Sequence, residues 1–521
     1  MVVGDVYRLR QQVKAMWTRN QAIFIVITLT LLGAGLRLYN IDAHSFNNDE
    51  VFSIWVAEHD ISFIMQFSMF GGGDSGIPPF HSVLLRAFLL IGEQPLVLRL
   101  PSALAGTLTV WLTFRLAAYL FGLRVATLST FLMAVAPLHI ARSQLARAHT
   151  LASLWALFSL YFFARLLFQE GRGRDWIGLV TATAAALWTF HTTFLVVLFE
   201  NVCIALIWLR RRLSGPMLNR WFVSQVGLGI VVLATLLSAL SAVSDVKLEW
   251  LTRPGLQELV KSAILFSTGD PSYGPIGVTP ARILSLMTIV GICTLGLWVF
   301  LQCRYHRRLD DEGRRVLFVV GASMVPWLTV FAISQVRPIY KERYFLFIMP
   351  PLFILFAWIF IRARHRIISS SILLALIGIT GSALFVYYTA PAGEQWREAV
   401  AYMRRAYQSD DLVVISPGHY GRPFAYYFHG SFPPDLATLA YRPALVVEDG
   451  EFRALNISPE AEGARIDDPA LATAQRVWLV SGYAPVDPVV LLWADQNFET
   501  LHTGEFVGAC VRLLQRTKRH I

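Results

Sequence analysis

Long apolar runs recur along the first three quarters of this chain and constrain its fold more than any other feature. The runs extend over roughly 18 to 23 residues, the length that an α-helix needs to cross the hydrocarbon core of a bilayer. Hydrophobic residues make up 55% of the 521 positions and charged residues only 15%, whereas a soluble globular protein carries about 25% charged residues. The mean hydropathy of +0.52 agrees with this pattern. We therefore expect a polytopic α-helical membrane protein.

The net charge of +10 follows from the expected topology. The basic residues lie in short clusters between apolar runs, such as "RRRLSGPMLNR" and "CRYHRRLDDEGRR", which is the pattern that the positive-inside rule describes. We therefore expect membrane lipids and no nucleic acid among the partners. The cysteines have no C-x-x-C spacing and predict neither a disulfide framework nor a metal site; they are Cys203, Cys293, Cys303 and Cys510.

Charge parity favours about eleven spans with a cytoplasmic N-terminus. No small-residue cleavage site follows the first run, so we interpret that run as a retained span. In the long first outer loop, residues 39–96, the segments "FSIWVAEHDISFIMQF" and "PFHSVLLRAFLLIG" are predicted to be amphipathic helices lying at the interface. The better defined spans are predicted at about 21–38, 97–119, 124–141, 150–168, 176–209 (two spans), 221–243 and 367–388.

The composition changes at about residue 389. "EQWREAVAYMRRAY" has the apolar spacing of an amphipathic helix, and "DLVVIS", "ALVVED" and "RVWLVSG" are typical of short strands. We therefore expect two domains. Residues 1–388 form the transmembrane domain, and residues 389–521 form a small α/β domain outside the membrane.

The expected outer face of the membrane combines an acidic pair with several bases. Asp49 and Glu50 lie in the first outer loop, whereas Arg and His residues at the outer ends of later spans break the positive-inside trend. This combination suits a reaction with an anionic leaving group, because bases neutralise a phosphate while a carboxylate accepts a proton. The bases are Arg142, Arg147, His149, His191, Arg337, Lys341 and Arg343.

Each of these residues also has a structural interpretation. An acidic pair in a loop is usually solvated, and Arg142 and Arg147 could extend to lipid headgroups. His191 could be hydrogen-bonded at a helix end, and Arg343 could pair with Glu342. The residues alone leave these alternatives open.

Several stretches read together resemble a known family. They are "NNDEVFSIWVA", "GIPPFHSVLLRAFLLIGEQPLVLRLPSALAGTLTVWLTFRLAAYLFG", "APLHIARSQLARAHTLASLWALFSLYFFARLL", "RPIYKERYFLFIMPPLFILFA" and "QWREAVAYMRRAYQSDDLVVISPG". In this order they resemble a bacterial member of the GT-C glycosyltransferases, in the family 39-like clan of protein O-mannosyltransferases and aminoarabinose transferases. The resemblance covers nearly the whole chain and is strongest over 45–168.

The resemblance implies an inverting enzyme of the bacterial inner membrane with its active site on the outer face. The enzyme would move a sugar from a polyprenyl-phosphate donor to a protein, lipid or cell-envelope glycan. The resemblance assigns Asp49 as the general base, with Glu50 orienting it or contacting the sugar. Donor-binding roles fall on Gln144, Arg147, His149, His191, Lys341, Arg343 and Tyr344, with Arg343 at the lipid phosphate.

The pattern also departs from the family and leaves cofactors open. Ile77 stands where many relatives have His or Lys before the double proline, and His149 or Thr150 stands where relatives often have a second Asp. No metal or other cofactor is required in principle, because phosphate is an adequate leaving group. Acidic residues near Asp49 could nevertheless hold a divalent cation.

Three other functions compete with this interpretation. A transporter or flippase of lipid-linked sugar would use the same bases, but it is expected to show charges at mid-span or internal repeats. A glycan polymerase or ligase would use similar donors, and a binding module would use the C-terminal domain alone. The predicted spans are largely free of charge and the early Asp-Glu pair is present, which favours the transferase. The sequence specifies neither the sugar nor the acceptor.

Overall fold

The computed structural model describes residues 2–517 apart from 71–77, 170, 211–213, 246–251, 269–309, 364–365, 390–392, 434–438, 441, 456, 461–462 and 467. The chain forms two compact units. The first comprises Met1–Tyr39, His59–Glu93 and Val97–Ala390, and the second comprises Asn40–Glu58, Gln94–Leu96 and Pro391–Ile521. The segment that carries Asp49 therefore groups with the C-terminal part of the chain, although we expected it in the domain 1–388.

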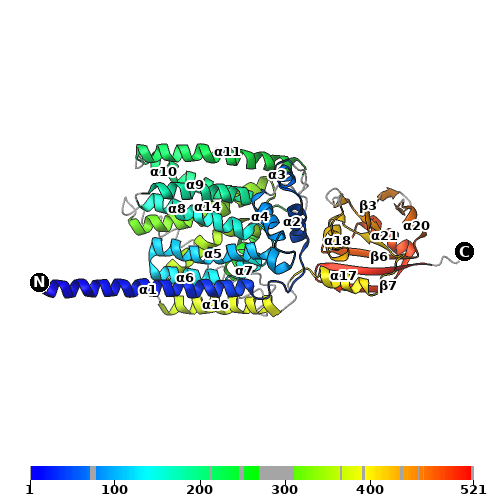
Figure 1. The fold of residues 1–521 in the computed structure, drawn as a ribbon, viewed down its shortest axis with the longest axis horizontal. Helices are drawn as coiled ribbons and strands as arrows, with labels where there is room; N and C mark the ends of the chain where they lie inside the picture. Colours follow the sequence, from blue (N-terminus) through cyan, green and yellow to red (C-terminus); the bar gives the residue numbers. More distant parts are fainter. Residues whose placement is uncertain are drawn as a thin grey trace. The chain divides into compact units, whose positions relative to one another are not determined.

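The first unit is helical (Figure 1). Its helices are α1 (Val2–Leu38), α3 (Ile61–Phe70), α4 (Phe80–Leu89), α5 (Pro95–Phe121), α6 (Leu123–Ala134), α7 (Pro137–Ser143), α8 (His149–Phe168), α9 (Gly173–Thr189), α10 (Phe194–Leu209), α11 (Gly215–Asp245), α12 (Leu256–Thr268), α14 (Asp311–Val336), α15 (Met349–Arg362) and α16 (Arg366–Thr389). Two 3₁₀ segments precede α10 and α15, namely η2 (His191–Thr193) and η5 (Glu342–Ile348).

Among the described residues, seven helices are long and apolar enough to cross a membrane, or eight if one bent pair counts as a span. The chain is thus a multi-pass membrane protein, but the predicted count of eleven is too high for this part of it. Helix α9 has only 17 residues, which is short for the hydrocarbon core. The span predicted before "CRYHRR" lies outside the described residues.

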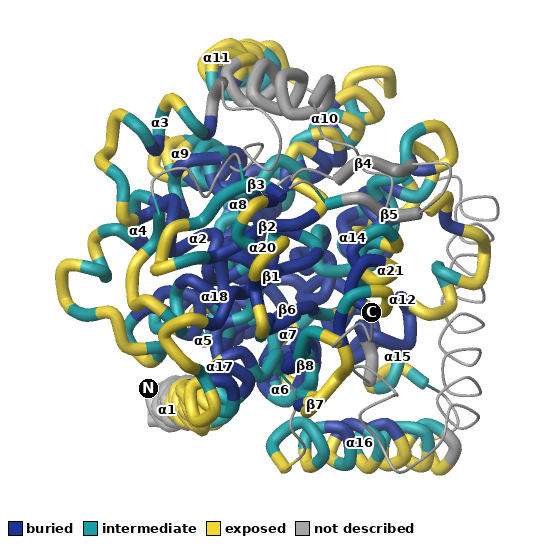
Figure 2. Tube along the Cα trace, turned by 90° about the vertical axis from the view of Figure 1, so that its right-hand side faces the viewer, coloured by how far each residue is buried: buried dark blue, intermediate teal, exposed yellow. Residues whose placement is uncertain are grey.

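Burial separates the central spans from the peripheral ones. In the span Glu342–Arg362, 78% of the most apolar window is buried, against 11% in Asn20–Leu38. Figure 2 shows the same contrast, with exposed residues along α1 and α11 and buried residues in α5 and α7. A lipid-facing span needs no protein partner for its apolar side chains, because the bilayer is their solvent.

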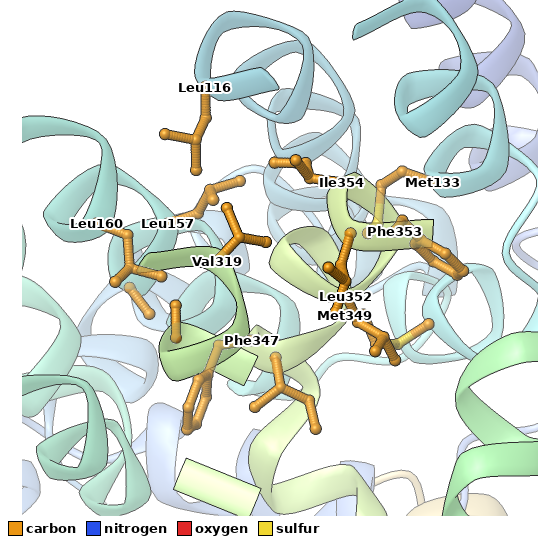
Figure 3. Packing of buried hydrophobic residues seen from close by; sticks show 14 of the residues in the cluster. Leu116, Met133, Leu157, Leu160, Val319, Phe347, Met349, Leu352, Phe353 and Ile354 are labelled. Atoms are coloured by element: carbon orange, nitrogen blue, oxygen red, sulfur yellow. The ribbon is translucent and has the colours of Figure 1, made fainter. Parts of the chain in front are cut away.

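The core of the first unit lies where α15 packs between its neighbours. The side chains labelled in Figure 3 belong to this core cluster. The residues include Leu116 from α5, Met133 from α6, Leu157 and Leu160 from α8, Val319 from α14, Phe347 from η5, and Met349, Leu352, Phe353 and Ile354 from α15. This packing holds together α8 and η5, the elements that carry His149, Arg343 and Tyr344.

The predicted span 124–141 is broken in the structure. Helices α6 and α7 meet at an angle of 57°, because Pro137 has no N–H to donate and the preceding Ala136 takes an extended conformation. The break leaves helix-end carbonyl groups without their usual partners. The buried guanidinium of Arg37 donates to two of them, Met133 at 3.2 Å and Ala134 at 3.1 Å.

Residues 39–96 contain the two predicted interfacial segments as three helices. "PFHSVLLRAFLLIG" contains α4, as expected. The first segment is divided at His59 and Asp60 into α2 (Asn48–Glu58) and α3. Our prediction of an amphipathic α2 is wrong, because Glu50 and all the residues from Val51 to Ala57 are buried.

The second unit contains a six-stranded sheet in the order β3-β2-β1-β6-β8-β7. Strands β1 and β6 are parallel and the other neighbours are antiparallel. The strands are β1 (Leu412–Ile415), β2 (Leu445–Glu448), β3 (Glu451–Ala454), β6 (Arg476–Gly482), β7 (Phe498–Phe506) and β8 (Ala509–Arg516). A separate hairpin consists of β4 (Ile457–Glu460) and β5 (Gly463–Ile466). The three strands and the helix predicted from the sequence are confirmed as β1, β2, β6 and α17 (Trp396–Arg404).

Helices cover both faces of this sheet. Successive side chains of a strand point to opposite faces, so Val413 and Ile415 join one cluster while Leu412 and Val414 join the other. The first cluster is completed by α17, η6 (Gly418–Tyr420) and α18 (Gly421–Phe428). The second is completed by α20 (Pro469–Thr473) and α21 (Pro488–Asn497). The unit is therefore an α/β domain with its own core.

Candidate active site

The acidic pair lies in the first turn of α2, where the backbone organises it. The Asn47 side chain accepts a hydrogen bond from the Glu50 N–H at 2.8 Å, and the Glu50 carboxylate accepts one from the Asn47 N–H at 3.1 Å. This reciprocal pair is a capping box, which satisfies N–H groups that a helix start leaves open. Glu50 is fully buried and Asp49 is half-buried. The structure thus gives the two acids different surroundings.

A third carboxylate joins them from far along the chain. Glu394 accepts hydrogen bonds from the Asn48 N–H at 3.0 Å and from the Trp396 indole N–H at 2.7 Å. Burial raises the pKa of Glu394, and the negative charges of Asp49 and Glu50 raise it further. Sequence reasoning missed Glu394, because its sequence distance from Asp49 gives no local signal.

Further contacts fix the segment before and after Asp49 within the second unit. The Ser45 hydroxyl donates to Glu398 at 2.8 Å, and the Phe46 N–H donates to the Tyr427 hydroxyl at 2.6 Å. The buried guanidinium of Arg422 lies 4.5 Å from the centre of the Phe52 ring, a cation–π arrangement. Helix α2 is therefore an integral part of this unit.

The first unit gathers most of the predicted bases. The imidazole of His149, at the start of α8, interacts electrostatically with Arg147, Arg343 and Arg142. These residues come from three places in the sequence, namely the end of α7, the turn before α8 and the start of η5. We call Arg142, Arg147, His149 and Arg343 the basic cluster. Such a concentration of guanidinium groups favours binding of a phosphate, which can accept two parallel hydrogen bonds from one arginine.

Aromatic side chains border the basic cluster. The Tyr344 ring lies 6.2 Å from His149, and the Phe190 ring lies 5.1 Å from His149 and 5.7 Å from Tyr344. The Thr192 hydroxyl donates to the Tyr344 carbonyl, which joins η2 to η5. His191 is the neighbour of Thr192 in η2, and the Lys341 carbonyl accepts the Tyr344 N–H at 3.0 Å. The predicted residues His191, Lys341 and Tyr344 thus belong to segments that meet at this cluster.

His81 is a member of these surroundings that sequence reasoning missed. It lies in α4, two residues after Pro79, and interacts electrostatically with Arg147 and His149. Burial, together with the positive charge of Arg147, lowers the pKa of His81 to about 3. His81 is therefore neutral at physiological pH and adds hydrogen-bonding capacity without adding charge. The departure noted at Ile77 lies outside the described residues.

The backbone at Arg147 is tied to α5. The Ser102 hydroxyl donates to the Arg147 carbonyl at 3.0 Å, and the Thr150 hydroxyl donates to the Ser102 carbonyl at 3.1 Å. Ser102 belongs to the "RLPS" stretch that carried part of the family resemblance. This pair fixes the turn that carries Arg147 and His149.

Gln144 is held by other parts of the first unit. Its side-chain N–H₂ group donates to the carbonyls of Tyr39 at 2.7 Å and Arg37 at 3.2 Å, and its side-chain oxygen accepts the Tyr387 hydroxyl at 2.7 Å. Gln144 therefore joins the ends of α1 and α16. The described residues contain no group of three or more His, Cys, Asp or Glu side chains that could hold a metal ion.

The acidic residues and the basic cluster belong to different compact units. The comparisons with known proteins bear on both. Residues 77–246 match the family model described as dolichyl-phosphate-mannose-protein mannosyltransferase. This segment contains His81, Gln144, Arg147, His149 and His191. None of the curated proteins compared with the chain matches it.

Solved structures show the same fold over nearly the whole chain. ArnT from Cupriavidus metallidurans in the apo state is 12% identical, with a TM-score of 0.56, and the match covers 95% of this chain and 98% of that one. The ArnT structure bound to undecaprenyl phosphate is also 12% identical, with a TM-score of 0.54, over 94% and 97% of the two chains. The oligosaccharyltransferase of Archaeoglobus fulgidus is 14% identical with a TM-score of 0.49. The match covers 79% of this chain but only 64% of that protein.

The family model and the two ArnT structures support the resemblance stated from the sequence. The chain has the fold of ArnT, with a helical membrane unit and a small C-terminal sheet domain. Its segment 77–246 carries the sequence pattern of the mannosyltransferase family.

Proposed function

We propose that the protein is an inverting glycosyltransferase that uses a polyprenyl-phosphate-linked sugar. The observation that carries this proposal is the basic cluster, in which Arg142, Arg147 and Arg343 interact electrostatically with His149. It lies in a chain with the fold of ArnT, one structure of which holds undecaprenyl phosphate. A lipid phosphate diester is an anion of suitable size and charge for such a cluster.

The proposed reaction is a direct displacement. The acceptor hydroxyl or phosphate oxygen attacks the anomeric carbon while Asp49 takes its proton. The bond between the anomeric carbon and the phosphate oxygen breaks, and its electron pair leaves with the polyprenyl phosphate. Arg343, with Arg147 or His191, stabilises the negative charge that develops on the leaving group. Attack from the face opposite the leaving group inverts the anomeric configuration.

The remaining residues support these two roles. Glu50 holds the first turn of α2 through the capping box, and Tyr344 with His149 lines the donor phosphate site. Lys341 adds positive charge beside Arg343. The acceptor is a protein, lipid or envelope glycan on the outer face of the bacterial inner membrane, the side to which the positive-inside rule assigns these residues.

One observation favours a second candidate function. Glu200 in α10 is fully buried within a span, and acidic residues at such depth often belong to ion pathways of transporters. A transporter of lipid-linked sugar would use the same basic cluster without a base at Asp49.

Sugar transfer in membranes tests the proposal. Membranes containing the wild type or Asp49→Asn are supplied with labelled polyprenyl-phosphate sugars, and label in the acceptor fraction is measured. Transfer by the wild type alone supports the enzyme and its base. Equal transfer by both proteins would exclude Asp49 as the base. Lipid binding by both without transfer would favour the transporter.

A further inference from the structure

Glu394 combines two contacts with the first turn of α2. Its carboxylate accepts the Asn48 N–H at 3.0 Å, which is one of the N–H groups that a helix start leaves open. The same carboxylate interacts electrostatically with Asp49 and Glu50. A residue 345 positions after Asp49 therefore contacts the backbone next to the candidate base, within one compact unit.

The surroundings of Glu394 hold its carboxylate in place. The Trp396 indole N–H donates to it at 2.7 Å, and Trp396 itself is fully buried in the core under α17. The ionisable groups that face Glu394 are Asp49 and Glu50 from α2 and Tyr420 from η6. Because α2 and α17 both use this carboxylate, its position is determined from two sides.

We propose that Glu394 is a positioning residue for Asp49, fixing the first turn of α2 through Asn48 and, in its ionised form, placing a negative charge beside the base. A neighbouring negative charge disfavours the ionised form of a carboxylic acid and so makes Asp49 a stronger base. A general base whose pKa lies nearer the operating pH transfers protons more effectively. The proposal rests on the transferase function and gives the C-terminal domain a part in the reaction.

The first experiment compares pH profiles of sugar transfer in three variants. Glu394→Gln keeps an oxygen that accepts the Asn48 N–H but removes the charge, whereas Glu394→Ala removes both. We expect the acid limb of kcat/KM to move to lower pH by roughly half a pH unit in Glu394→Gln. Glu394→Ala should lower kcat about 10-fold or more, since the helix start also loses its partner. Glu398→Gln is the matched control, because Glu398 is paired with Ser45 and Arg397, and it should leave the acid limb unmoved.

A second experiment reads the charge at position 49 without using transfer. Asp49→Cys places a thiol there, and its alkylation rate against pH reports how readily the thiol ionises. Mass spectrometry of the peptide that contains position 49 separates this thiol from the native cysteines. We expect the midpoint of the rate profile to fall in Asp49→Cys/Glu394→Gln relative to Asp49→Cys, and to stay unchanged with Glu398→Gln.

The two measurements separate failure of this inference from failure of the proposed function. A shifted thiol midpoint together with a shifted acid limb supports both. A shifted midpoint in a protein that transfers no sugar supports the position of Glu394 and overturns the transferase. An unshifted midpoint overturns the inference about Glu394, whatever the activity.

Discussion

The hydroxyl of Ser159 donates a 2.7 Å hydrogen bond to the carboxyl of Glu200, inside the helical unit. Ser159 also lies 2.8 Å from the Thr183 hydroxyl, so α8, α9 and α10 meet at one polar contact. All three side chains are buried. A carboxyl group in such surroundings is held by its hydrogen bonds rather than by solvent.

Replacing Glu200 separates its structural role from a transport role. Glu200→Ala should lower the free energy of unfolding by about 1–3 kcal/mol, because Ser159 loses its acceptor in a buried place. Glu200→Gln keeps an acceptor oxygen and should unfold close to the wild-type temperature in detergent. Normal stability of Glu200→Gln with loss of lipid-linked sugar transport in vesicles would support the transporter.

Arg343 is expected to govern the affinity for the donor. Arg343→Ala should raise KM for the polyprenyl-phosphate sugar by roughly 10- to 150-fold, the range for loss of a hydrogen bond to a charged group. Arg343→Lys should recover part of the loss, since an ammonium keeps the charge but not the planar fork. Steady-state kinetics with short-chain donors measures the effect. Arg337→Ala, which changes an arginine at the end of α14, is the control, and an equal rise in its KM would remove the special role of Arg343.

The capping box between Asn47 and Glu50 predicts how substitutions of these two residues change the stability of the protein. Asn47→Ala removes the acceptor for the Glu50 N–H and should cost about 1 kcal/mol of stability. Glu50→Gln retains an oxygen for the Asn47 N–H and should lose little stability. Thermal unfolding and limited proteolysis check both. If Glu50→Gln folds normally but loses most of its sugar transfer, the charged carboxylate of Glu50 contacts the sugar in the wild type.

The hydrogen bonds of Gln144 connect the ends of α1 and α16, so substitutions of Gln144 are expected to change the stability of the protein. Gln144→Glu replaces the N–H₂ group that donates to Tyr39 and Arg37 with an oxygen facing carbonyl oxygens, so it should be more destabilising than Tyr387→Phe. Tyr387→Phe removes one hydrogen bond, worth about 1 kcal/mol. Unfolding temperatures in one detergent rank the two. A raised donor KM in Gln144→Ala without any change in unfolding temperature would instead place Gln144 at the donor.

The sequence alone predicted the membrane helices and the C-terminal sheet domain, because these depend on local periodicity and on charge along the chain. Hydrophobic length located α5, α8 and α16 well. Hydrophobic length did not reveal the break at Pro137. The hydrogen-bond donor for the carbonyl groups at the break is Arg37, which lies in another helix and gives no local signal. Hydrophobic length also mistook α2 for an interfacial helix, because an apolar run does not say which partner buries it.

The sequence predicted those residues of the candidate site that stand out by their charge or by the family pattern. Arg147, His149 and Arg343 lie together as a cluster. His81 and Glu394 were missed because a lone histidine on a short helix and a lone acid after the last span are common features. Only the fold brings His81 to Arg147 and Glu394 to Asn48.

The hydrogen bond between Asn48 and Glu394 also sets an order of events during synthesis. The two residues are 346 positions apart, so at about 5–20 residues per second α2 leaves the ribosome on the order of tens of seconds before its partner exists. During that interval the start of α2 lacks its acceptor, and Phe46 and Ser45 lack Tyr427 and Glu398. The candidate base is therefore set in its final place only after the tail of the chain has been made, and a chain cut short before Glu394 carries Asp49 without the structure that holds it.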